Sequence, residues 1–277
     1  MIDLERVNYL VQRIGRNFLP GPVARLGRRL FRLVPGPETA WPDETAERYL
    51  RVAAEAGRPV EGRRVMLFGS GPSFAVACRL LRAGAERVVL YDKFARPDDR
   101  INGPLVADYP DLVGRVDGRV APVTDRMVLV EPATDDDATA FPEVDVILSS
   151  SVLEHVDDVE GWARRLAAVT APGGVNLHLV DLRDHFFSTP FEMLRYSERT
   201  WSRWLNPRGH LNRYRIPDYE RAFRTAFERV SIEITRRDEA AFEAARRWIR
   251  PELLTGDDAV DAATIVLLRA EQDERAE

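Results

Sequence analysis

The strongest constraint on the fold is the segment 65–93, VMLFGSGPSFAVACRLLRAGAERVVLYDK. An apolar run ends in a turn with Gly69 and Gly71, a helical stretch follows to Gly84, and a second apolar run ends at Asp92. Glycine lets the chain turn tightly and brings backbone N–H groups against a ligand at the start of a helix. A carboxylate about 20 residues beyond such a turn can accept both hydroxyls of a ribose. The segment therefore predicts a parallel β-α-β unit that binds a nucleoside.

A dinucleotide fits this unit less well. The sixth position of the GxGxxG pattern is Phe74, where close packing of the helix on the strand requires Gly or Ala. The same alternation of apolar runs and helical stretches continues along the chain, which indicates a parallel sheet covered on both faces. The expected strands are 64–68, 87–91, about 126–131, 144–149, 175–181, 229–235 and 263–269, with helices at 43–57, 73–83, 158–169 and 217–228. Residues 95–125, rich in Pro, Gly and Asp, have no clear assignment.

Composition excludes several classes of protein. The 277 residues, 45% of them hydrophobic, suffice for one large α/β domain with extensions. We expect a cytoplasmic protein, because no secretory signal is recognisable and no window approaches the roughly 20 apolar residues of a membrane span. Cys78, the single cysteine, rules out an internal disulfide and a cysteine-rich zinc site, and its apolar neighbours indicate a buried helix residue. The net charge of −5 argues against a nucleic-acid partner.

A second block identifies a family resemblance. Residues 144–181, VDVILSSSVLEHVDDVEGWARRLAAVTAPGGVNLHLVD, contain a strand, a loop with LEHV, a helix, a PGG turn and another strand. With the glycine turn before it, this block resembles the class I S-adenosylmethionine-dependent methyltransferases, in particular the small-molecule branch, over about residues 60–182. The resemblance implies a Rossmann-like seven-stranded α/β sheet closed by an antiparallel hairpin. It also implies S-adenosylmethionine as the cofactor and O-, N- or C-methylation of a small metabolite.

The resemblance also implies which residues hold the cofactor. The turn of Phe68, Gly69, Ser70 and Gly71 is expected at the methionine moiety, Asp92 at the ribose and Lys93 beside the adenine, with Asp135 or Asp136 at the adenine amino group. The end of the fourth strand is expected below the sulfonium, through Ser149, Ser150, Ser151 and His155. Each serine could equally cap the loop, and His155 could act as a base or only fix the loop by a hydrogen bond.

Two positions depart from the pattern of the family. The acid expected two residues before the first glycine is Leu67, and the third glycine is Ser73. The acid orders the turn or the cofactor's amino group in the family. Cofactor binding is therefore looser in this chain, or a carboxylate from elsewhere replaces the missing one.

The acceptor is expected beside the segment that follows the fifth strand, because ligands of open α/β sheets bind at the carboxyl ends of the strands. We predict a cap at about 183–216, with His185 as the general base, and no metal, since Asp181, Asp184 and His185 are loosely spaced. The predicted acceptor contacts are Phe186, Tyr196, Trp201, His210 and Arg213, although the aromatics could instead form the cap's own core. Six arginines against two glutamates in 185–215 favour an anionic acceptor, but Lys93 is the only lysine, so arginine is a general bias.

The first 34 residues carry seven arginines against two acids, a net charge of +5, with apolar residues at helical spacing. We divide the chain into a helical arm and linker (1–42) and a methyltransferase-like domain (43–277). The arm could pack on the domain or on a second subunit of a homodimer, cover the active site as a lid, or adsorb to an anionic membrane surface. Two rival functions also remain: a different reaction of S-adenosylmethionine, and a non-catalytic partner subunit that binds the cofactor.

Overall fold

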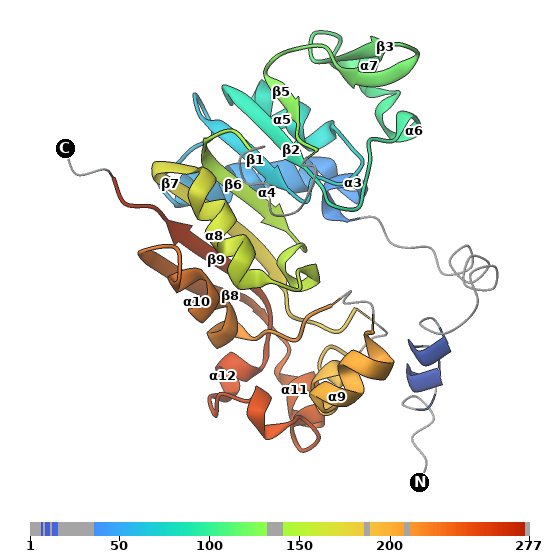
Figure 1. The fold of residues 1–277 in the computed structure, drawn as a ribbon, viewed down its shortest axis with the longest axis vertical. Coiled ribbons are helices and arrows are strands. Elements are labelled where there is room, and N and C mark those ends of the chain that lie inside the picture. Colours follow the sequence, from blue (N-terminus) through green and yellow to red (C-terminus); the bar gives the residue numbers. More distant parts are fainter. Residues whose placement is uncertain are drawn as a thin grey trace.

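A seven-stranded sheet forms the centre of the molecule (Figure 1). The computed structural model describes residues 7, 9–11, 13–15, 36–131, 141–185, 189–207 and 211–274. In the sheet order β5-β2-β1-β6-β7-β9-β8, the first five strands run parallel, and β9 is antiparallel to both β7 and β8. Their bounds are β1 Arg64–Phe68, β2 Arg87–Tyr91, β5 Met127–Leu129, β6 Val144–Ser150, β7 Thr170–Asp181, β8 Arg229–Arg237 and β9 Ala263–Glu271. The predicted Rossmann-like sheet with its closing hairpin is confirmed.

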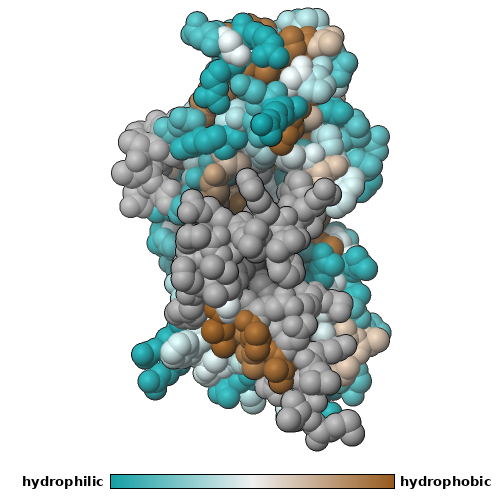
Figure 2. Space-filling model, turned by 90° about the vertical axis from the view of Figure 1, so that its right-hand side faces the viewer, coloured by the Kyte–Doolittle hydropathy of each residue, from teal (hydrophilic) through white to brown (hydrophobic). Residues whose placement is uncertain are grey.

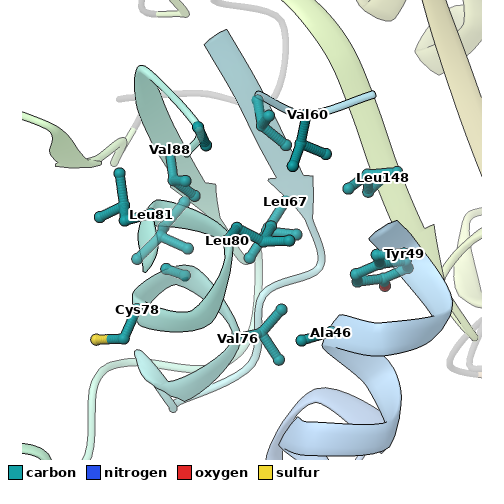
Figure 3. Packing of buried hydrophobic residues seen from close by; sticks show 14 of the residues in the cluster. Ala46, Tyr49, Val60, Leu67, Val76, Cys78, Leu80, Leu81, Val88 and Leu148 are labelled. Carbon is teal, nitrogen blue, oxygen red and sulfur yellow. The ribbon is translucent and has the colours of Figure 1, made fainter. Parts of the chain in front are cut away.

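Two pairs of helices cover the faces of this sheet, as the nearly continuous apolar strands predict. On one face lie α4 (Pro42–Glu55) and α5 (Ala75–Arg82), and on the other lie α8 (Val159–Val169) and α10 (Ile216–Arg224). Figure 3 shows the first contact, with side chains of both helices against those of β1, β2 and β6: Ala46, Tyr49, Val76, Leu80, Leu81, Leu67, Val88 and Leu148. Each fully buried large side chain contributes roughly 1.5–3 kcal/mol, so these faces fix the positions of the strand ends. Cys78 lies in this core, and burial raises the pKa of its thiol to about 12.

Two stretches contain elements that the sequence did not predict. Residues 35–42, expected as a linker, contain the short helix α3 (Pro37–Ala40), which packs on α4 and α5. The unassigned stretch 95–125 forms α6 (Asp99–Asn102), α7 (Leu105–Asp108) and a hairpin of β3 (Val113–Val116) with β4 (Arg119–Pro122). Asp117 and Gly118 make its two-residue turn with φ of 51° and 81°, and left-handed conformations at both positions suit a tight hairpin.

A third apolar cluster lies apart from the sheet and forms a cap. Its first part follows β7, in the segment predicted as a cap, and contains η3 (Glu192–Arg195), α9 (Glu198–Thr200) and η4 (Trp201–Leu205). Its second part lies between β8 and β9 and contains α11 (Glu239–Arg246), η5 (Pro251–Leu253) and α12 (Asp258–Asp261). The sequence pattern did not indicate that the hairpin connection contributes to the cap.

The described part of the arm packs on this cap. The Tyr9 hydroxyl donates to Asp184 Oδ2 at 2.6 Å, and the Arg13 guanidinium reaches Asp184 Oδ1 at 2.9 Å. The same guanidinium lies 4.3 Å from the centre of the Trp201 ring. Val7, Val11 and Ile14 are exposed on this helix, and Figure 2 shows an apolar patch on the face of the molecule that carries it. In the described segments, no helix has the length and apolar character needed to cross a membrane.

Candidate active site

The glycine turn follows β1 and is held against the end of β2. Gly69 N and Ser70 N donate to the carbonyl oxygen of Tyr91, at 2.8 and 3.0 Å. Gly69 and Gly71 have φ of +83° and +65°, which side chains rarely adopt. A Cβ on Gly71 would lie 3.0 Å from Thr39 Oγ1, and one on Gly69 would lie 2.2 Å from Val152 Cγ2. The turn is therefore a cradle between α3 and the loop after β6 that only glycine fits.

Asp92 anchors the turn from the end of β2. Its Oδ2 accepts from Gly71 N at 2.9 Å, and its Oδ1 accepts from Phe94 N and Ala95 N at 2.8 and 2.7 Å. A carboxylate offers about four acceptor positions, so a ribose hydroxyl can still donate to Oδ2. Asp92 thus fixes the turn and retains one acceptor position, on Oδ2.

A pocket opens beside Asp92, between the ends of β2 and β5. Its lining residues are Ser70, Gly71, Phe74, Leu90, Asp92, Ala95, Arg96, Pro97, Leu129, Val130 and Glu131. Apolar walls interrupted by a few charged side chains are typical of small-molecule sites. Lys93 is exposed and does not belong to this lining. Asp135 and Asp136 fall outside the described residues, whereas Glu131, which the sequence pattern placed in the strand, stands at the pocket.

A buried carboxylate that sequence reasoning missed lies next to the glycine turn. Glu38 of α3 is only 4% exposed and accepts a 2.6 Å hydrogen bond from the Tyr49 hydroxyl. Burial raises its pKa from the ordinary 4.5 to about 7, and the charge of Asp92 adds to this shift. Its neighbour Thr39 faces Gly71. An acidic group therefore lies beside the glycine turn, although Leu67 occupies the position at which the family pattern has an acid.

The serines at the end of β6 have different surroundings. The Ser149 hydroxyl lies 2.7 Å from His178 Nδ1, inside the core between the sheet and α10. Burial lowers the pKa of His178 to about 3, so this ring is neutral, as expected of a core histidine. Ser150 is buried, and Ser151 has a φ of 56°. Left-handed backbone at a residue other than glycine costs about 1–3 kcal/mol, and such strain clusters at functional sites.

A group of titratable side chains lies at the carboxyl ends of β6 and β7. Glu154 and His155 sit on the short turn η2 (Leu153–His155), and His185 follows β7. The His155 and His185 rings are 5.1 Å apart, and His185 Nε2 lies 3.9 Å from Glu154 Oε1 and 3.6 Å from Asp181 Oδ2. Burial raises the pKa of Glu154 far above its usual range, and the charge of Asp181 adds to the effect. Glu154 was not predicted as a site residue, although it belongs to the LEHV motif.

The predicted acceptor contacts lie mostly in the cap core. Tyr196 and Trp201 are 8% and 3% exposed within the third apolar cluster, which is the alternative that the sequence left open. The Arg213 guanidinium donates to the backbone oxygens of Met193 and Tyr196 and pairs with Glu198. His185 is exposed, at the edge of the cap. Phe186 and His210 fall outside the described residues.

The sequence matches a family described as the methyltransferase domain, over residues 42–226. The chain belongs to this family. The matched range includes the glycine turn, Asp92 and the LEHV loop, so the methyltransferase is an enzyme whose cofactor is S-adenosylmethionine. The glycine cradle, the free acceptor position of Asp92 and the pocket beside it fit that cofactor.

Solved structures show the same fold at low sequence identity. A provisionally named sarcosine dimethylglycine methyltransferase from Galdieria sulphuraria is 12% identical, with a TM-score of 0.51 over 83% of this chain and 86% of that one. A Haemonchus contortus phosphoethanolamine N-methyltransferase, in complex with phosphomonomethylethanolamine and S-adenosylhomocysteine, is also 12% identical. Its TM-score is 0.51 over 95% of this chain and 59% of that one. No curated protein sequence matches the chain.

Proposed function

We propose that the enzyme methylates a small-molecule acceptor held at the carboxyl ends of β6 and β7, at the edge of the cap. The observation that carries this proposal is the contact between the glycine turn and the loop after β6. The space for a Gly69 side chain is filled by Val152, two residues before Glu154. The cofactor's methionine end and the group of Glu154, His155 and His185 therefore border the same space. The names of both solved neighbours, which are those of small-molecule methyltransferases, agree with a small acceptor.

The protein contributes chiefly by positioning the acceptor. The cofactor supplies a methyl group on a positively charged sulfur, and an in-line displacement requires the acceptor atom on the far side of that carbon. The exposed imidazole of His185 is the side chain best placed to take a proton from the acceptor. Asp181 Oδ2 and Glu154 Oε1 lie within 4 Å of its Nε2. Asp181 is itself held by the Arg183 guanidinium, which keeps the pKa of the Asp181 carboxyl below its usual range despite burial.

Three of the six arginines in 185–215 make contacts within the cap. Arg195 pairs with Glu192, and Arg213 pairs with Glu198. Arg215 donates to the backbone oxygens of Leu182, Asp261 and Ala263. These three guanidinium groups hold the cap together, so the arginine excess of the segment gives weaker support to an anionic acceptor.

Transfer of a labelled methyl group tests the proposed function. When the enzyme is incubated with methyl-labelled S-adenosylmethionine and an extract of small metabolites, label should enter the small-molecule fraction. His185→Ala should lower this transfer at least tenfold and leave the affinity for S-adenosylhomocysteine unchanged, because His185 lies outside the lining of the nucleoside pocket. Label found only in protein or RNA of a whole-cell extract would contradict a small-molecule acceptor.

We also infer that Glu38 replaces the acid missing at Leu67 and binds the amino group of the cofactor's methionine moiety. A buried carboxyl beside a cationic ammonium group is stabilised in its charged form. The groups that face Glu38 are Tyr49, Asp92 and Arg48. With a pKa of about 7 in the free enzyme, Glu38 holds its proton in much of the population at pH 6 and must release it when the ammonium group binds.

Proton release on binding is the expected result. Calorimetry of S-adenosylhomocysteine binding at pH 6, in buffers of different ionisation enthalpy, should show that the wild type releases protons and that Glu38→Gln releases none. Glu47→Gln, on the exposed side of α4, is the control and should release protons as the wild type does. Folding gives a second readout. The Glu38 carboxyl loses its proton near pH 4.5 in the unfolded chain and near pH 7 in the folded chain. The free energy of unfolding therefore falls as the pH rises between these values, by about 3 kcal/mol in all, at about 1.36 kcal/mol per pH unit. Equal proton release by Glu38→Gln would exclude this role.

A further inference from the structure

The residues Glu154, His155 and His185 bring one carboxylate and two imidazoles together. One ligand atom from each residue can be chosen so that all three lie within 4.8 Å of one another. Within the described ranges, this is the only set of three such groups with that spacing. The two imidazole rings come from different strand ends, since His155 follows β6 and His185 follows β7. The sequence pattern suggested a different set, with Asp181 and Asp184, and no metal was expected there.

Glu154 is the member of this group that most needs a partner. It is 2% exposed, and neither of its carboxylate oxygens has a hydrogen-bond partner among the described residues. A buried carboxyl without a partner is costly, and a cation removes that cost. The neighbouring Arg183 guanidinium is already engaged, because it donates to both oxygens of Asp181. The Glu154 oxygens therefore lie beside two imidazoles, and no described arginine or lysine is paired with them.

The backbone around Glu154 is held rigidly. Asn212 Nδ2 donates to the carbonyl oxygens of Leu153 and Val156, at 2.8 and 2.9 Å, and Asn212 N donates to Glu154 O at 2.7 Å. The Tyr219 hydroxyl fixes the other end of the Asn212 amide, at 3.0 Å from its Oδ1. This loop thus presents Glu154 and His155 from a preorganised turn, which a ligand site requires.

We propose that Glu154, His155 and His185 bind one divalent transition-metal ion. Two imidazoles and one carboxylate are a ligand set that zinc and other first-row metals accept, and three protein ligands leave coordination positions open. An acceptor hydroxyl bound at an open position would lose its proton more readily. This part deepens the proposed function and rests on it: His185 then acts as a metal ligand and not as a proton acceptor. Binding of the ion itself does not depend on methyl transfer.

Cobalt and zinc titrations of the full chain, freed of metal by a chelator, test the site. The wild type should bind one Co²⁺ per chain, with visible absorption bands of nitrogen and oxygen ligation, and Zn²⁺ should displace it. Glu154→Gln and His185→Ala should each weaken binding at least tenfold, because even the loss of a supporting partner typically costs 10–100-fold in metal affinity. Glu160→Gln, an equal change at an exposed carboxylate of α8, should have no effect.

The outcomes separate the metal site from the proposed function. Glu154→Gln keeps the shape of the side chain, and His185 is exposed, so both variants should fold; binding of S-adenosylhomocysteine by each sample verifies this. A protein that binds S-adenosylhomocysteine but no Co²⁺, or that binds Co²⁺ equally well in both variants, overturns the metal site. A protein that binds Co²⁺ through these residues and yet labels no small molecule retains the metal site and contradicts the proposed function.

Discussion

Gly69→Ala is expected to lower the free energy of unfolding by about 2–5 kcal/mol and to abolish tight cofactor binding. A side chain in a left-handed conformation costs roughly 1–2 kcal/mol, and overpacking of a filled site adds about 1–3 kcal/mol. Gly69 has a φ of +83°, and its new Cβ would lie 2.2 Å from Val152 Cγ2. Relief of this contact must move either the glycine turn or the loop that carries Glu154. Urea denaturation measures the stability, and calorimetry with S-adenosylhomocysteine measures the binding.

Two further variants separate the strain from the contact. Gly57 has a φ of +70°, and a methyl group added there would meet no heavy atom within 4 Å. Gly57→Ala should therefore show the backbone strain alone and leave binding intact. In a Val152→Ala background, Gly69→Ala should lose less stability than it does in the wild type, because the contact is removed. Equal losses for Gly57→Ala and Gly69→Ala would show that Val152 does not confine the turn.

The sequence was sufficient to predict the central sheet, because the relevant signals are local. Strands β1, β2 and β6 are apolar on both faces, and each begins or ends within a residue of its expected bound. β5 is shorter than expected, which places Glu131 at the pocket and not in the strand. The difference arises because the ends of a strand depend on the neighbour with which it pairs. β5 pairs with β2 alone, over three residues.

The missed site residues are those that tertiary contacts bring in. Glu38 lies in a segment of Pro and Gly that is typical of a linker, and only the packing of α3 on α5 brings it to the turn. The second half of the cap is inserted between β8 and β9, so its contact with the first half, such as that of Phe242 with Phe191, is distant in the sequence. Glu154 could have been noticed, because it stands inside the quoted LEHV motif. Its burial with no hydrogen-bond partner among the described residues could not have been predicted. Tyr196, Trp201 and Arg213 illustrate the opposite error, because they were predicted to contact the acceptor and instead lie in the core of the cap.

The affinity of S-adenosylhomocysteine for Asp92→Ala tests the central claim most directly, namely that the cofactor's ribose lies at the end of β2. The wild type should bind the ligand, and Asp92→Ala should bind it at least tenfold more weakly. A hydrogen bond to a charged group contributes roughly 1.5–3 kcal/mol, and the substitution also removes the acceptor for the N–H groups of Gly71, Phe94 and Ala95.

Asp98→Ala provides the matched control, because Asp98 likewise accepts from backbone N–H groups, at the start of α6, but does not line the pocket. Calorimetry on the three proteins should show equal affinity for the wild type and Asp98→Ala and a much weaker one for Asp92→Ala. Equal affinity for all three would contradict the claim and would place the cofactor elsewhere on the chain.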